Sequence, residues 1–469
     1  MPDERGTDEA DAGGAGPSKG LVARLKRLAG KLLEGERSML TRLAGAAFLV
    51  RVASAALAFV AQVLLARWMG AYDFGIYVYV WTWAVMLGLM APLGLGSAAQ
   101  RFLPEYTEKG DAARLGGFLR GARWLAFGLG AAIALAGLLV VWAVSGRIAP
   151  YYVVPLAIAF ACLPFYALSE VQDGIARSYD WVGLALAPFY IACPILILAA
   201  IGTLHALGAE VNATRAILAA TLATILAAIG QGVVLDRRLA RREDLPGAAL
   251  KARPRHERRA WMRVALPIFM IESFYLLLTY TDILVLEIFV PPDQVAVYYA
   301  ATKTLAPVAF VYFSVAAAVT HKFTAFHVAG ERDKLARFLA DTIHWTFWPS
   351  LAAAIGLLAL GKPILSLFGP GFEAGYPLMF VLAAGLLARA LVGPVERLLV
   401  MLGEEKACAA VYAVAFLVNL GLCFLLIPRF GLMGAAVAPT IAYMLESVLL
   451  VVVARRRLGF NAFVLGRPA

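Results

Sequence analysis

Charged side chains lie deep inside long apolar stretches of this chain. A charge placed in hydrocarbon is costly, so such groups usually face a water-filled cavity or pair with a partner. The residues concerned are Arg51, Lys303, Arg389, Glu272, Asp282 and Glu446. Groups of this kind can bind an anion, hold helices together or carry a proton, so each is a candidate functional residue.

The cations suit the recognition of phosphate. An arginine offers a forked guanidinium that stays charged in any surroundings, and a lysine offers a compact point charge. At 100° per residue, Arg51 shares a helix face with Gln62, and Lys303 shares one with Tyr299. We expect these four residues to line a cavity that binds substrate. The alternative for Arg51 is a snorkelling or ion-paired structural role.

Arg389 is the fifth candidate for binding substrate. Glu396 and Arg397 lie close to it in the same apolar stretch. These three charges could hold helices together just as well as contact a substrate.

Three carboxylates are candidates for carrying a proton or a cation. Glu272 follows Arg51 by 221 residues, which is the spacing of an internal repeat described below. Asp282 lies near the outer end of its apolar stretch, where we expect it to meet water. Glu446 has no partner evident in the sequence, and its alternative role is a helix-to-helix hydrogen bond.

No motif for bond chemistry is present. The sequence lacks the glycine-rich GxxxxGKS or GxxxxGKT loop that cradles nucleotide phosphates. The histidines are scattered, and the four cysteines stand in apolar runs without metal-site spacing. We therefore expect no enzyme activity, no catalytic residues, no metal and no cofactor.

The elements that must position these charges are membrane-spanning helices. Of the 469 residues, 62% are hydrophobic and 16% charged, and the mean hydropathy is +0.78. Apolar runs of about 20 residues recur, each long enough to cross roughly 30 Å of hydrocarbon. We expect an all-α polytopic membrane protein. The twelve predicted spans are 43–66, 75–99, 118–144, 151–169, 182–204, 213–235, 263–286, 294–320, 338–360, 378–402, 407–427 and 433–454, of which 151–169 is interrupted by Pro155 and Pro164.

Lysine and arginine are concentrated in alternate loops, which predicts that both termini lie in the cytoplasm. A basic loop divides the chain into two lobes of six spans, and its charge favours contact with anionic lipid. The predicted parts are a disordered tail with a basic amphipathic helix (1–38), a first lobe (39–235), a basic cytoplasmic linker (236–262), a second lobe (263–455) and a cytoplasmic tail (456–469).

The two lobes repeat each other. Tyr77 aligns with Tyr298, and GDAARLGGFL (110–119) aligns with GERDKLARFL (330–339). Because each lobe has six spans, both begin on the same side, and the repeats are parallel about an axis along the membrane normal. Two such bundles leave a central cleft between them, which is the architecture of alternating access.

The segment LLARWMGAYDFGIYVYVWTW (64–83), followed by LGLGSAAQRFLPEY (93–106), resembles the first-to-third-span signature of polysaccharide biosynthesis flippases. These flippases belong to the multidrug/oligosaccharidyl-lipid/polysaccharide exporter superfamily. Residues 298–310, 395–407 and 427–445 are similar to that family too. The resemblance implies two six-helix lobes around a V-shaped central cavity.

The resemblance also implies a function. The protein would flip an undecaprenyl-pyrophosphate-linked oligosaccharide across the inner membrane. The oligosaccharide would be of O-antigen, lipopolysaccharide, capsule or exopolysaccharide type, and the coupling ion would be H⁺ or Na⁺. Its partners would be this lipid-linked oligosaccharide, membrane lipids and the polysaccharide polymerase and chain-length machinery, with no nucleic acid.

Two other functions stay open. One is a multidrug or small-molecule antiporter of the same superfamily, although a lumen with several cations suits a pyrophosphate cargo better than a drug. The other is a membrane polymerase or ligase of polysaccharide assembly, from which we would expect a long external loop with catalytic residues. The longest external loop predicted here has about sixteen residues, which disfavours that function.

Overall fold

The computed structural model describes residues 17–242, 253–459 and 463–464, and the side chains of these residues except 17–52 and 321. The chain divides into two compact units, residues 1–53 and Ser54–Ala469, and each is described by itself. All regular secondary structure in the described residues is helical, as predicted. The apolar and basic faces of the predicted amphipathic helix, the residues before it and the middle of the basic linker lie outside what is described.

In the first half of the chain, the elements are α1 (Pro17–Met90), α2 (Leu95–Glu108), α3 (Ala112–Val144), α4 (Pro150–Phe160), α5 (Leu163–Ser178), α6 (Val182–Ala187), the π-helix η1 (Pro188–Ala192), α7 (Cys193–Ala206) and α8 (Ala213–Ala240). Side-chain caps fix where two of them begin. Asp111 accepts a hydrogen bond from the Arg114 amide at 3.0 Å, and Asn212 accepts one from the Arg215 amide at 3.0 Å. Such caps satisfy amides that have no partner inside the helix.

In the second half, the elements are α10 (Arg258–Phe289), α11 (Pro292–Thr304), α12 (Ala306–Val328), α13 (Arg332–Ala359), α14 (Gly361–Ser366), the 3₁₀ helix η2 (Phe372–Gly375), α15 (Tyr376–Ala390), α16 (Val395–Met401), α17 (Glu405–Phe430) and α18 (Leu432–Leu458). Proline occupies the first helical position of α11, where its fixed φ suits the helix and its missing N–H has no role.

Two breaks shape the first half. Within α1, Gly70 has φ 78° and ψ 166°, a conformation that side chains disfavour and glycine adopts freely, so the helix turns there. The second break separates α4 from α5, which are bent by 42°. Pro164 stands at the start of α5, and the predicted interruption of span 151–169 lies at this bend. Pro155 stays inside α4 without ending it.

Among the described residues, nine helices are long and apolar enough to cross a membrane, and the bent pair α4–α5 makes a tenth. A multi-pass α-helical membrane protein is therefore confirmed. The predicted span 75–99 and residues 53–66 of the predicted span 43–66 fall within one long stretch of that count, Ala53–Glu108. The predicted span 338–360, which corresponds to α13, is not among the nine. The number twelve stays a prediction.

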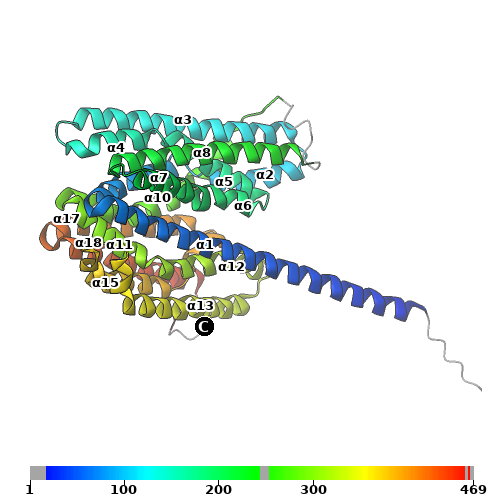
Figure 1. The fold of residues 1–469 in the computed structure, drawn as a ribbon. Coiled ribbons are helices and arrows are strands. Elements are labelled where there is room, and N and C mark those ends of the chain that lie inside the picture. Colours follow the sequence, from blue (N-terminus) through cyan, green and yellow to red (C-terminus); the bar gives the residue numbers. More distant parts are fainter. Residues whose placement is uncertain (1–16, 243–252, 460–462, 465–469) are drawn as a thin grey trace, which may run out of the picture. The chain divides into compact units, whose positions relative to one another are not determined.

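Helices of each half pack mainly against helices of the same half (Figure 1). In the first half, α5 contacts α2, α3 and α8; in the second half, α18 contacts α15 and α17. Helix α10 is shared, because it contacts α2 of the first half as well as α17 and α18 of the second.

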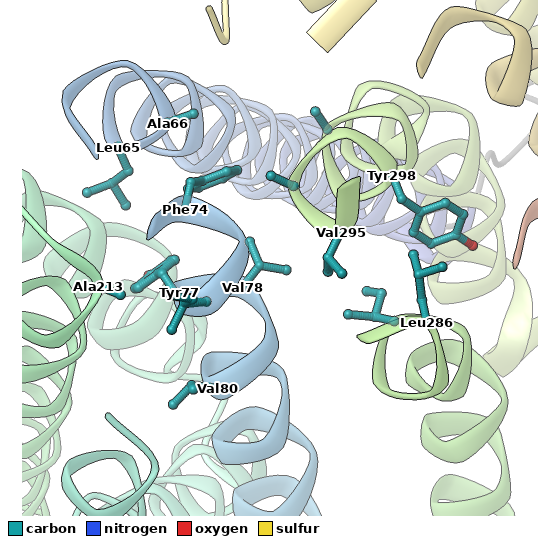
Figure 2. Packing of buried hydrophobic residues seen from close by; sticks show 14 of the residues in the cluster. Leu65, Ala66, Phe74, Tyr77, Val78, Val80, Ala213, Leu286, Val295 and Tyr298 are labelled. Atoms are coloured by element: carbon teal, nitrogen blue, oxygen red, sulfur yellow. The ribbon is translucent and has the colours of Figure 1, made fainter. Parts of the chain in front are cut away.

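The repeat identified in the sequence brings equivalent residues to one core. Tyr77 of α1 and Tyr298 of α11 are both buried in the same hydrophobic cluster. Figure 2 shows Phe74, Tyr77 and Val78 on one side of this cluster and Val295, Tyr298 and Leu286 on the other. The two halves thus meet through the duplicated segments themselves.

Candidate functional site

The larger of two neighbouring cavities is walled mainly by first-half helices and has a volume of about 370 Å³. Gln62 of α1 and Glu170 of α5 line it, and Tyr280 of α10 lines it from the second half. Its other polar and aromatic lining residues include Tyr77, Trp81, Tyr166, Asp173, Arg177, Phe189, Tyr190 and Thr224. Gln62, predicted to face a cavity, therefore does so.

A smaller cavity of about 220 Å³ lies where α2 meets α10. Glu272 and Tyr275 line it from α10, and Ser97 lines it from α2. The Ser97 hydroxyl donates a hydrogen bond of 2.7 Å to Glu272 Oε1, which links the two halves. Glu170 lines both cavities, so the two spaces adjoin at this carboxylate. Glu272 and Tyr275, three residues apart, thus share one face of α10.

Lys303 and Tyr299 lie one turn apart on α11 and are in contact, as their spacing predicted. The Lys303 amine lies 4.9 Å from the centroid of the Tyr299 ring. Tyr299 in turn packs edge-on against Phe74 at 6.0 Å, and Phe74 stacks on Tyr77 at 6.2 Å, which lines the larger cavity. Within the part of the chain that the structure describes, no hydrogen bond or ion pair engages the Lys303 amine. Neither Lys303 nor Tyr299 lines the two cavities, so their predicted place in the wall of a cavity stays a prediction.

Arg389 and Glu446 form a buried ion pair between α15 and α18. The Nε atom of Arg389 lies 3.3 Å from Oε1 of Glu446, and the two side chains are 10% and 2% exposed. The Arg389 guanidinium also lies 5.1–5.4 Å from the ring centroids of Tyr275, Tyr312 and Tyr443. The sequence placed both residues in spans but gave Glu446 no partner, because residues 57 positions apart show no pairing in one dimension.

Asp282 is not where we expected it. It is 6% exposed, and the Tyr298 hydroxyl donates a hydrogen bond to its Oδ2. The same hydroxyl oxygen lies 3.0 Å from the carbonyl oxygen of Ala435 in α18. The expectation that Asp282 meets water is therefore wrong, because the duplicated tyrosine covers it. Its role as a carrier of an ion stays a prediction.

The side chain of Arg51 lies outside the described residues, so its predicted place in a cavity stays a prediction.

Glu170 and its neighbour Asp173 line the larger cavity but were not predicted from the sequence as site residues. The predicted span ended at residue 169, one position before Glu170. The internal repeat could have pointed to Glu170, because this residue aligns with Glu396. The spacing of Asp173 and Arg177 would also have predicted their ion pair, which is 2.7 Å long.

Close packing of the two halves defines one end of the site. A Cβ atom built on Gly75 of α1 would lie 1.7 Å from the carbonyl oxygen of Pro292, the first residue of α11. Nearby, the Tyr152 hydroxyl of α4 donates a hydrogen bond to Glu287 of α10, and the Arg67 Nε donates one of 2.7 Å to the Leu367 carbonyl oxygen. The halves are therefore in direct contact through backbone and side chains.

Comparisons with known proteins agree with this arrangement. A family model for "polysaccharide biosynthesis protein" matches residues 40–320, and a MatE model matches residues 267–425. No curated protein sequence matches the chain significantly.

Solved structures share the fold at low sequence identity. The inward-facing conformation of a multidrug resistance MATE family transporter of the MOP superfamily has a TM-score of 0.71 and 16% identity, over 88% of this chain and 98% of that one. The lipid II flippase MurJ, in an inward closed conformation, has a TM-score of 0.67 and 16% identity, over 87% of each chain. A MOP superfamily transporter from Pyrococcus furiosus with a reverse-polarity binding pocket has a TM-score of 0.65 and 14% identity, over 88% and 94%.

These matches show a transporter fold and not that of an enzyme. The polysaccharide biosynthesis model covers more than half of the chain, on the residues whose resemblance the sequence already indicated. The chain therefore belongs to the polysaccharide biosynthesis protein family and has the fold of MOP superfamily transporters.

Proposed function

We propose that this protein flips an undecaprenyl-pyrophosphate-linked oligosaccharide across the cytoplasmic membrane by alternating access, for surface polysaccharides such as O-antigen, capsule or exopolysaccharide. In this proposal twelve spans form two six-helix lobes around a V-shaped cavity, with both termini in the cytoplasm. A proton or sodium gradient drives the cycle through Glu272, Asp282 or Glu446. The family and the fold of the flippase MurJ support it.

The observation that carries the proposal is the pairing of opposite chemistries across the two halves. Lys303, on the second half, has an amine that forms no hydrogen bond or ion pair with any described residue. The larger cavity, mostly in the first half, presents an amide, carboxylates and aromatic rings. A cargo with a pyrophosphate and a sugar on one molecule needs both kinds of surface.

The flipping step needs the halves to separate at one end. The contact between Gly75 and Pro292 is close enough that the two helices must move apart before a sugar could pass between them. The interface is built from the repeated segments, so a rocking motion of one lobe on the other would open it. The predicted topology places this contact at the external end.

The direct test in cells is deletion of the gene in the source organism. Surface polysaccharide should disappear, and lipid-linked oligosaccharide should accumulate in the inner leaflet of the membrane. The wild-type gene should restore the polymer, and a copy encoding Lys303→Ala should not. Normal polymer in the deletion strain, with no second flippase gene present, would contradict the proposal.

A second candidate function has one observation in its favour. The MatE model matches residues 267–425, and the MATE transporters compared above share the fold. An exporter of this type should protect cells from cationic drugs and dyes. Unchanged drug tolerance in the deletion strain, together with lost polymer, would exclude it.

A further inference from the structure

We propose that the larger cavity is a binding site for one sugar of the cargo, and that it accepts neutral or amino sugars but excludes uronic acids. This inference rests on the proposed function and specifies its substrate class. It assigns the pyrophosphate to the side of Lys303 and the sugar to the side of Gln62, Glu170 and Asp173.

The cavity wall contains two hydrogen-bond acceptors that no donor of the described residues satisfies. Two acceptor atoms, Gln62 Oε1 and Asp173 Oδ1, are buried without a hydrogen-bond partner among the described residues. They belong to different helices, α1 and α5, and both residues line the cavity. A buried acceptor without a donor costs about 1–3 kcal/mol, so a ligand that brings donors is favoured there.

The acidic side chains of the cavity wall disfavour an acidic sugar. Glu170 and Asp173 line the cavity with one cation, Arg177, whose Nε donates to Asp173 Oδ2 at 2.7 Å. Asp173 and Arg177 neutralise each other, so the wall is neutral when Glu170 is protonated and carries a net charge of −1 when it is ionised. A uronic acid would add a third carboxylate in a confined space, which like-charge repulsion disfavours. The same repulsion keeps the pyrophosphate out of this cavity.

The volume and the aromatic lining of the larger cavity also suit a sugar ring. The volume of about 370 Å³ falls in the range of roughly 300–1,000 Å³ typical of small-molecule sites. Aromatic rings make up much of the wall, from Trp81, Tyr166, Phe189, Tyr190 and Tyr280. The C–H face of a sugar ring can pack on such rings while its hydroxyl groups reach the acceptors.

An organic cation would suit the acidic and aromatic residues of the wall, but it would satisfy fewer of the unpaired acceptors than a sugar. The unsatisfied acceptors lie on two helices, and one of them is an uncharged amide. A polyol supplies several O–H donors in different directions, so it can satisfy acceptors on separate walls. A tertiary or quaternary ammonium ion supplies one donor or none, and would leave Gln62 Oε1 unpaired.

The test is binding of short-chain prenyl pyrophosphates to the purified full-length protein in nanodiscs, measured by calorimetry. Four probes differ only in their head: glucose, glucosamine, glucuronic acid, or no sugar. The wild type should bind the glucose and glucosamine probes about tenfold tighter than the glucuronate probe, a difference of about 1.4 kcal/mol. Equal affinities for glucose and glucuronate would overturn the inference.

Variants locate the effect. Gln62→Leu should weaken the glucose probe about fivefold, as for one lost hydrogen bond, and leave the sugar-free probe unchanged. Glu170→Gln should raise affinity for the glucuronate probe towards that for glucose. Glu108→Gln, a matched change of an exposed glutamate at the end of α2, should alter neither. An equal loss for the sugar-free probe in Gln62→Leu would contradict the sugar site.

The result also separates this inference from the proposed function. If the wild type binds the sugar-free prenyl pyrophosphate but does not discriminate among sugars, the flippase proposal stands and the sugar site is wrong. If none of the four probes binds, the proposed function is wrong and the sugar site falls with it.

Discussion

Arg389 Nε lies 3.3 Å from Glu446 Oε1, both side chains are buried, and the rings of Tyr275, Tyr312 and Tyr443 surround the guanidinium. The pair joins α15 to α18. It also borders the site, because Tyr275 lines the smaller cavity. Removing either partner would leave a buried charge uncompensated.

The first prediction concerns this pair. Arg389→Met and Glu446→Leu should each destabilise the protein by about 3 kcal/mol, because each leaves one charge buried alone. The double variant should be much closer to wild type, since no lone charge remains. Thermal unfolding in detergent measures this. Additive losses in the double variant would show that the two side chains act independently.

The second prediction concerns Lys303. Lys303→Ala should abolish surface polysaccharide at normal membrane levels, because the pyrophosphate loses its cation. Lys303→Arg should retain activity. Arg51→Ala should act like Lys303→Ala if both side chains bind the pyrophosphate. Polymer length and amount on gels provide the readout.

Lys362 is a matched control for Lys303. Its amine also lies over a tyrosine ring, 5.4 Å from the centroid of Tyr376. Neither lysine lines the two cavities, but Lys362 is exposed whereas Lys303 is partly buried. Lys362→Ala should leave the polymer normal. Wild-type polymer from Lys303→Ala would remove Lys303 from the site.

The third prediction concerns Gly75. Gly75→Val should hold the halves apart, because any side chain there would overlap the Pro292 carbonyl. Spin labels on cysteines at Tyr72 and Gln294, one on each half, should report a longer distance than in wild type. The four native cysteines are buried and should label slowly.

Gly128→Val is the control for this substitution, since a Cβ at Gly128 meets nothing within 4 Å. Its distance distribution should match that of wild type. Transport should fail in Gly75→Val alone, because the external end can no longer close. An unchanged distance in Gly75→Val would mean that the contact gives way without separating the lobes.

The fourth prediction concerns coupling. Glu272 lines the smaller cavity and bridges the halves through Ser97. Glu272→Gln should make transport in proteoliposomes insensitive to a proton or sodium gradient, because the amide cannot exchange a proton or balance a cation. Ser97→Ala removes the hydrogen bond but keeps the carboxylate, and should preserve the gradient response. Gradient-sensitive transport by Glu272→Gln would exclude this residue as the coupling group.

The class of the fold could be predicted from the sequence because the patterns that indicate it lie within short segments of the chain or in the alignment of its two halves. Apolar runs, loop charges and the aligned Tyr77 and Tyr298 are all visible in one dimension. The shared face of Lys303 and Tyr299 followed from helical spacing alone.

Contacts between distant helices could not be predicted in this way. The pairing of Arg389 with Glu446, the cover that Tyr298 places over Asp282 and the approach of Gly75 to Pro292 each join different helices. Their sequence separations carry no periodic signal. Glu170 was missed for a simpler reason, since Pro164 bends its span and α5 continues nine residues beyond the predicted end.

The most direct measurement is translocation by the purified protein in proteoliposomes. A fluorescent undecaprenyl-pyrophosphate-linked oligosaccharide is placed in the outer leaflet, and an impermeant quencher reports the fraction that moves inward. The proposed function requires protein-dependent protection from the quencher, lost in Lys303→Ala and kept in Lys362→Ala. Equal protection in protein-free liposomes and in liposomes with the wild-type protein would contradict it.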